Sequence, residues 1–487
     1  MNTESGPRAA AAVRREASPG RRGGFPAAGL AVVLTGAFIT VLDYFIANVA
    51  VPSIQAGLHA SSAEAQGVIV GYGVAFTAGM VTGGRIGDLY GRRRLFTAGM
   101  ALFMVTSAAC GLAPSAAVLV GMRVLQGAAA SLMVPQVLGI VAVMCPDEAS
   151  RNRAFTVYGL VLGLAAVFGQ LIGGLLITVN IAGIGWRAIF WLSVPVCAVS
   201  LPLVRRLVPE SRHAGGARLD VPGALLVTAA LAVLAFSLTA GQQEGWPLWS
   251  WLCLAATVPL LAITAGYLHR MSRTGGSPVI DPGLFRERRF PAGLAALLAY
   301  FMALGPFFFL LALYLQRGHG LSPLGSGLVF FALGVGYLAS SLLAPRLAGT
   351  VGQRAVLVAG PVTVAAGYVL VAVVVTATPV TGPVGWLVPP LVVAGTGMGL
   401  TTGPLTSAVL AGVAPNHAAS ASGAANTAQE GGAAIGVAIV GTVFFPALGR
   451  HSGHAAYPHA FATGLIPLIA FCLLSAVLIT LMGGTSR

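Results

Sequence analysis

Two charged residues inside long apolar stretches are best placed to do chemistry. Asp43 lies about 16 residues into a stretch that begins near residue 27, and Arg123 lies about 7 residues into one that begins near residue 116. As a helix, the first stretch places Asp43 roughly 24 Å from its start. Holding a charged aspartate in hydrocarbon costs on the order of 3 kcal/mol, and such residues usually serve transport or proton relay. Asp43 therefore predicts a proton-binding carboxyl; the alternative is a hydrated aspartate near the outer interface.

Arg123 needs partners because a guanidinium stays charged when it is buried. A carboxylate, a backbone carbonyl or water can supply them, and Gln126 lies three residues further on to support it. Two interpretations are open: an arginine coupled to transport, or one that ties helix backbones together.

Glu430 is the second candidate acid. It lies about 11 residues into an apolar helix if that helix begins near Ala419, but at the cytoplasmic edge if it begins near Gly431. The preceding run of alanine, serine, glycine and asparagine is equally typical of a loop, so both positions are open.

The chain that must position these residues is a membrane protein by composition. Its 487 residues are 56% hydrophobic and 8% charged, whereas soluble proteins carry about 25% charged residues. All 27 basic residues are arginine, so the phosphate-binding loop that needs a lysine is excluded. The 5 cysteines are scattered and predict neither disulfides nor a metal site. We expect no metal, cofactor or catalytic site, and hence no enzyme.

Apolar stretches long enough to cross a bilayer as helices, about 20 residues each, define the predicted elements. Fourteen are expected, near 27–51, 66–84, 95–114, 116–140, 154–178, 186–204, 222–241, 248–268, 291–315, 325–345, 355–376, 384–412, 419–446 and 459–482.

The arginines give an independent check on this topology, because cytoplasmic loops hold the excess of positive charge. With the N-terminus inside, 23 arginines fall on the cytoplasmic side and 3 on the other. Both termini are therefore expected in the cytoplasm, with residues 1–26 as a cytoplasmic tail. The net charge of +14 follows from these short loops, so no nucleic-acid partner is expected.

A weak internal repeat divides the chain. The segment from Gly84 to Arg94, GRIGDLYGRRR, has an echo at 346–354, RLAGTVGQR, which keeps two arginines and a glycine but has lost the acid. Repeated halves are typical of transporters. The spacing predicts an N-terminal six-helix bundle over 27–206, two extra helices with flanking loops over 207–290, and a C-terminal six-helix bundle over 291–487.

Several motifs together resemble the major facilitator superfamily, in its fourteen-helix drug/proton antiporter branch. They are the GRIGDLYGRRR segment, LDYFIANVAVP from residue 42, RVLQG from residue 123, GQLIGG from residue 169 and GWRAIF from residue 185. The resemblance covers nearly the whole chain. It implies that Arg123 couples proton movement to substrate movement, and that an acid such as Glu430 serves protons or cationic substrates.

The same resemblance implies a cytoplasmic gate at the glycine and arginine segment. Asp88 would face helix N-termini and arginines, and such an ionic latch can hold one side shut. The expected gate residues are Gly84, Gly87, Asp88, Gly91 and Arg92. The alternative is a turn that only sets topology.

The motif at residue 169 departs from the family. Its glycines Gly169, Gly173 and Gly174 permit close helix packing, but Gln170 stands where relatives carry proline. This replacement puts the usual bend of that helix in doubt.

Polar and aromatic residues within the spans could line a central cavity, although helix packing is the alternative for each. An apolar cavity with aromatic faces suits amphipathic and cationic ligands. The expected lining residues are Tyr44, Phe45, Gln126, Gln136, Gln170 and Tyr300.

These observations favour a proton-coupled exporter of amphipathic compounds, cations or antibiotics among them, that works by alternating access in a bacterial cytoplasmic membrane. Protons from outside would neutralise Asp43 and favour substrate release, and deprotonation inside would reset it. A metabolite uniporter or importer, or a receptor or scaffold that has lost transport, is the alternative. The expected partners are the substrate, protons and the lipid bilayer, with no obligate protein partner.

Overall fold

The computed structural model describes residues 27–180, 183–211, 220–245, 247–274, 282–285, 289–379, 382–411, 413, 418–449 and 456–482. The tail expected over 1–26 lies outside them. The long helices are α2 (Ala27–Leu58), α3 (Ser62–Tyr90), α4 (Arg92–Gly111), α5 (Ala116–Met144), α6 (Glu148–Val179), α8 (Ser193–Leu207), α9 (Val221–Gln243), α10 (Leu248–Arg273), α11 (Arg289–Leu313), α12 (Pro323–Val351), α13 (Gln353–Ala377), α14 (Val388–Leu410), α15 (Ala418–Leu448) and α16 (Tyr457–Leu481).

Short helical segments complete the fold. They are α7 (Ala188–Trp191), η2 (Gly185–Arg187), η3 (Pro282–Phe285), η4 (Tyr314–Gly318) and η5 (Val384–Leu387). Of the described residues, 13 helical stretches are long and apolar enough to cross a membrane. The chain is therefore an all-helical, multi-span membrane protein. Helix α6, the remaining long helix, has 32 residues, so its length also suits a span. Fourteen crossings and cytoplasmic termini stay predictions.

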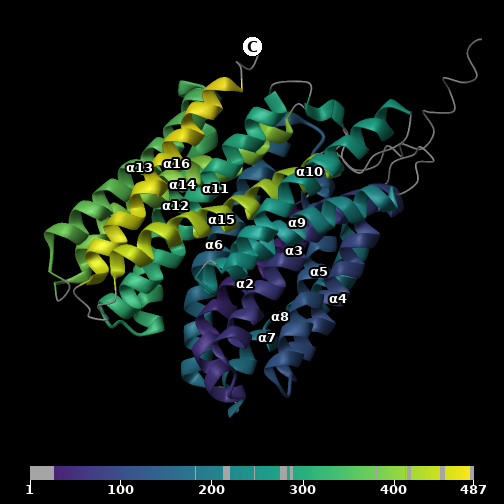
Figure 1. The fold of residues 1–487 in the computed structure, drawn as a ribbon. Coiled ribbons are helices and arrows are strands. Elements are labelled where there is room, and N and C mark those ends of the chain that lie inside the picture. The colour runs from purple at the N-terminus through teal and green to yellow at the C-terminus, as the bar shows by residue number, and fades with distance from the viewer. Residues whose placement is uncertain are drawn as a thin grey trace, which may run out of the picture.

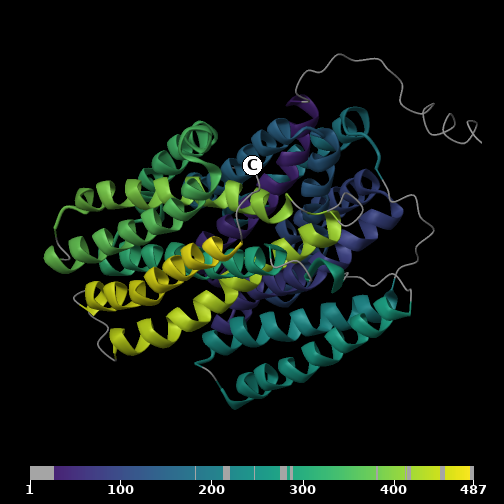
Figure 2. The same cartoon turned by 90° about the horizontal axis from the view of Figure 1, so that it is seen from above.

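Two groups of helices stand side by side, with a third pair against them (Figure 1). Helices α2 to α8 form the first bundle and α11 to α16 the second, while α9 and α10 run along one flank, as the view from above shows (Figure 2). Each bundle has apolar cores of its own. The bundles diverge away from the end that carries the C-terminus (Figure 1).

The predicted boundaries needed correction around the gate segment. The sequence predicted that a helix ends near Gly84 and that a loop follows, but α3 continues to Tyr90, and Gly91 alone, with φ of 111°, turns the chain into α4. Residues other than glycine rarely adopt this φ, so a glycine stands at the turn. The glycines before it instead bring α3 close to α5: a Cβ on Gly83 would lie 3.0 Å from the carbonyl carbon of Ser131.

Candidate functional site

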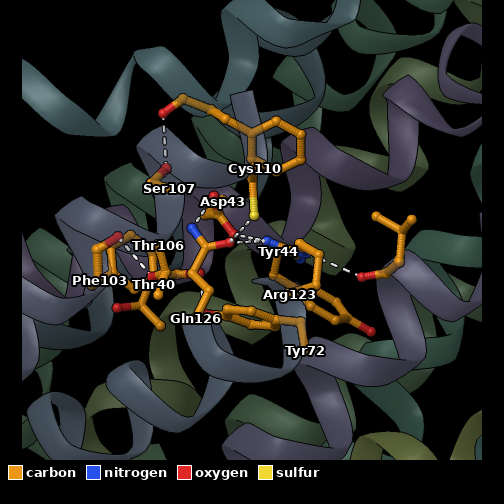
Figure 3. A network of polar contacts seen from close by, with 12 residues as sticks. Thr40, Asp43, Tyr44, Tyr72, Phe103, Thr106, Ser107, Cys110, Arg123 and Gln126 are labelled. Carbon is orange, nitrogen blue, oxygen red and sulfur yellow. Dashed lines mark hydrogen bonds and ion pairs between the residues drawn. The ribbon is translucent and has the colours of Figure 1, made fainter. Parts of the chain in front are cut away.

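Asp43 and Arg123 form an ion pair in the middle of the first bundle (Figure 3). Arg123 Nη1 donates to Asp43 Oδ2, and also to Gln126 Oε1 at 2.8 Å. The amide of Gln126 donates in turn to Asp43 Oδ1 at 3.1 Å. Arg123 and Gln126 are 0% exposed and Asp43 is 1% exposed. The structure thus brings together three residues that the sequence singled out, from two helices far apart in the chain.

Helix spacing and close packing position this cluster. Arg123 and Gln126 stand three residues apart on α5, so they share a face, and that face meets Asp43 on α2. The ring of Tyr72 on α3 lies 4.2 Å from the guanidinium carbon of Arg123. A desolvated cation over an aromatic face gains on the order of 2 kcal/mol. Tyr72 was not among the predicted site residues, because nothing in its local sequence pattern marks a partner of Arg123.

The bonding of Arg123 is incomplete. Its Nε donates to the carbonyl of Val68 at 3.0 Å, but Nη2 is buried without a hydrogen-bond partner among the described residues. With Asp43 ionised, the pair has no net charge. Protonation of Asp43 would leave a single buried positive charge, which is costly away from water. The stability of the site therefore depends on the charges of both partners.

Glu430 lies in the other bundle. Helix α15 begins at Ala418, so Glu430 is about three turns inside the helix; the alternative of a helix that starts near Gly431 is wrong. Within the described part of the chain, no hydrogen bond or ion pair of Glu430 is found. Helix α15 packs against α3 and α5 of the first bundle, so Glu430 lies on a helix at the interface between the bundles.

Some of the expected cavity residues lie at the interface between the bundles, and the others are packed inside one bundle. Tyr44 is 36% exposed and its ring meets that of Phe45 edge-on at 5.5 Å. Phe45 reaches across to Phe308 of α11, with ring centroids 5.6 Å apart. These two aromatic residues lie where the bundles face each other.

The other expected cavity residues make contacts within their own bundles. The hydroxyl of Tyr300 is 2.9 Å from that of Thr402, and Tyr300 is fully buried. The amide of Gln136 donates to the carbonyl of Gly83 at 2.8 Å and so ties α5 to α3. The side chain of Gln170 lies outside the described part of the structure, although α6 runs through this position without interruption.

The expected gate residues meet at the junction of α3 and α4. Arg92 donates to Asp88 at 2.8 Å, with both side chains buried, and to the carbonyl of Gly139 at 3.2 Å. Gly84 and Gly87 are buried in the last turns of α3. Sequence reasoning missed Glu210, which accepts from the backbone N–H of Arg93 at 3.1 Å. Its acidic charge directly after the last helix of the first bundle was the available signal.

The glycines of the residue-169 motif pack α6 against α2. A Cβ on Gly169 would lie 2.8 Å from the Cβ of Phe45, and one on Gly173 would lie 2.9 Å from Ile46 Cγ1. Gly174 is buried beside them. The motif therefore holds α6 against the helix that carries Asp43.

Comparison with known proteins decides the family. A profile described as Major Facilitator Superfamily matches residues 33–437. The chain belongs to the major facilitator superfamily. The probable actinorhodin transporter of Streptomyces coelicolor is 36% identical over 425 residues, covering 87% of this chain and 73% of the relative. The puromycin resistance protein pur8 of Streptomyces alboniger is 33% identical over 464 residues, covering 92% and 90%.

Solved structures of this superfamily share the fold. The human organic anion transporter MFSD10 aligns with a TM-score of 0.63 at 16% identity and covers 94% of this chain and 100% of its own. The proton:xylose symporter XylE aligns with a TM-score of 0.62 at 15% identity, covering 93% and 94%. The family and its bacterial members confirm the prediction of a multi-pass protein of the bacterial cytoplasmic membrane.

Proposed function

We propose that this superfamily member is a proton-coupled exporter of amphipathic compounds that works by alternating access. Its relatives support export, since they include the probable actinorhodin transporter and the cephamycin export protein CmcT of Amycolatopsis lactamdurans, which is 31% identical over 484 residues and covered to 96%. The buried pair of Asp43 and Arg123 is the observation that carries proton coupling.

Proton coupling follows from the chemistry of that pair. A proton that reaches Asp43 from the outer side binds a carboxylate oxygen and removes the negative charge that holds Arg123 Nη1. The guanidinium then keeps a positive charge with no buried anion beside it: Gln126 remains the partner of Nη1, and Nη2 has no partner among the described residues. This cost favours rearrangement around the site. Loss of the proton on the inner side restores the pair and resets the transporter.

Glu430 completes the proposal from the second bundle. Without an ion-pair partner in the described part of the chain, its carboxylate can receive either a proton or the positive group of a substrate. Tyr44 and Phe45 also lie at the interface between the bundles, and aromatic faces favour cations. Acids on both bundles allow substrate and proton to compete as the bundles move.

The test is proton movement in everted membrane vesicles that contain wild type, Asp43→Asn or Asp147→Asn. Lipophilic cations and antibiotics are added to vesicles with an established pH gradient. We expect them to discharge the gradient with wild type but not with Asp43→Asn. Asp147→Asn is the matched control and should behave as wild type: Asp147 caps the start of α6 by accepting from the backbone N–H of Ser150 at 2.7 Å, and asparagine caps a helix as well as aspartate. Transport by wild type that ignores the gradient would instead favour the uniporter.

A further inference from the structure

A cavity of about 700 Å³ lies between the helix pair α9 and α10 and the two bundles. Helices α9 and α10 form one wall, and α3, α11 and α15 form the others. This volume is within the range of small-molecule sites, about 300–1,000 Å³. The cavity is separate from the cluster around Asp43 and Arg123, neither of which lines it.

The lining of this cavity is apolar almost throughout. It contains aliphatic side chains from each wall, Phe285, three threonines and His269, and no acid or arginine. Thr264 uses its hydroxyl within its own helix, donating to the carbonyl of Leu260 at 2.7 Å. Thr427 on α15 retains a hydroxyl without a partner among the described residues. A charged group would be unpaired here at a high cost, so the cavity suits an uncharged, apolar body.

The cavity lies toward one face of the membrane. Its α10 residues run from Leu261 to His269, in the half of the helix that ends at Arg273. Its α15 residues start at Ala424, two turns from the beginning of that helix. The arginine distribution places both of these helix ends in the cytoplasm. The cavity therefore belongs to the depth of the inner lipid leaflet.

The walls of the cavity belong to both bundles, which the proposed transport cycle moves relative to each other. The hydroxyl of Thr82 on α3 lies 2.8 Å from that of Thr228 and 3.3 Å from the carbonyl of Ala224, so α9 is bonded to the first bundle. The opposite wall, α15, belongs to the second bundle. Gly431 lines the cavity and directly follows Glu430 in α15. Movement of the bundles would therefore change the cavity beside the segment of α15 that carries Glu430.

We propose that this cavity is an entry chamber, in which the apolar body of an amphipathic substrate is held after the substrate leaves the inner leaflet. The proposal rests on the proposed export function and names the route of its substrate. Contact with both bundles and proximity to Glu430 favour a transported molecule over a resident lipid chain. A lipid occupant is the contrary outcome of the test.

The test uses photolabelling of the full chain in lipid nanodiscs. One probe is an uncharged naphthalene that carries an alkyl diazirine; the other is a phosphatidylcholine with a diazirine in its acyl chain. Two substitutions fill the cavity, Ala265→Phe on α10 and Gly431→Leu on α15, where an added Cβ meets nothing within 4 Å. Gly266→Phe is the matched control, because Gly266 also has open space around it but does not line the cavity.

We expect the naphthalene probe to label lining peptides of α10 and α15 in wild type and Gly266→Phe, and at least fivefold less in both filled variants. Equal labelling in all four proteins would overturn the chamber. The proposal would also be overturned if only the lipid probe labelled the lining peptides and this labelling were lost in the filled variants. The occupant of the cavity would then be an acyl chain. Asp43→Asn separates the two proposals: it should abolish proton-coupled transport and leave labelling unchanged.

Discussion

Gly159 of α6 and Gly403 of α14 face each other across the two bundles, so closely that a Cβ on Gly159 would lie 2.7 Å from the Cα of Gly403. The hydroxyl of Tyr337 on α12 donates to the carbonyl of the same Gly159. Nearby, Ser422 of α15 donates to the carbonyl of Pro135 at 3.3 Å. These contacts close the bundles against each other in the halves of the helices predicted to be cytoplasmic.

A bulky residue at Gly159 should prevent this closure. We expect Gly159→Leu to lower transport at least tenfold, because the bundle backbones can no longer approach. Gly121→Leu should transport normally, since an added Cβ there meets nothing within 4 Å. Uptake of a fluorescent substrate into everted vesicles measures both. Normal transport by Gly159→Leu would show that the observed contact is not needed in the cycle.

Removing Arg123 should cost more stability than removing both charges. Arg123→Met leaves Asp43 buried without its cation, which costs on the order of 3–5 kcal/mol. Arg123→Met combined with Asp43→Asn leaves no unpaired charge, so we expect its melting temperature in detergent to lie between those of the single variant and wild type. A double variant less stable than Arg123→Met would argue against a strong buried pair.

The contacts of Asp88 and Glu210 predict different losses of transport when each acid is replaced by its amide. Asp88→Asn removes the buried carboxylate that Arg92 contacts, and we expect transport to fall about tenfold as the closed cytoplasmic side is weakened. Glu210→Gln keeps an acceptor for the backbone N–H of Arg93, so a loss of at most about threefold is expected. Transport rates at matched protein levels in the membrane decide between them, and equal losses would contradict a specific latch.

The stabilisation that the N-terminal cap of helix α3 provides should depend on pH. Hydrogen bonds from the backbone and hydroxyl of Ser61 lower the pKa of Glu64 below its ordinary value of 4.5. Because the folded-state pKa is lowered, this stabilisation is complete above about pH 4.5 and is lost as the pH falls through the folded-state pKa. The melting temperature of wild type should therefore exceed that of Glu64→Gln at pH 7 and approach it near pH 3. A constant difference would mean that the charge does not contribute.

Much of the fold could be predicted because lipid makes the sequence pattern simple. Each crossing needs about 20 apolar residues, so the presence and order of the long helices follow from hydropathy. Boundaries were harder: the run Gly84 to Tyr90 has loop composition, yet it is helical and its Gly87 packs α3 onto Gln136 of α5. The same composition left Glu430 ambiguous, although α15 begins well before it.

The candidate site was only partly predictable. Asp43 and Arg123 stand out because charges are rare in apolar stretches, and their similar depth made a pairing possible. The pairing itself depends on which helices are neighbours, and the contact with Tyr72 depends on packing that no local pattern encodes. Gln136 shows the opposite case: a polar side chain in a span that bonds a neighbouring backbone instead of a cavity.

The attachment of α9 through Thr82 and Thr228 has a consequence for how such a chain could arise. A helix pair at the midpoint of the chain that is hydrogen-bonded to the first half in this way can move together with that half. The two halves can then move relative to each other as they would without the extra pair, which moves with the first half. A twelve-helix transporter could in this way acquire two helices in a single event without first losing its mechanism.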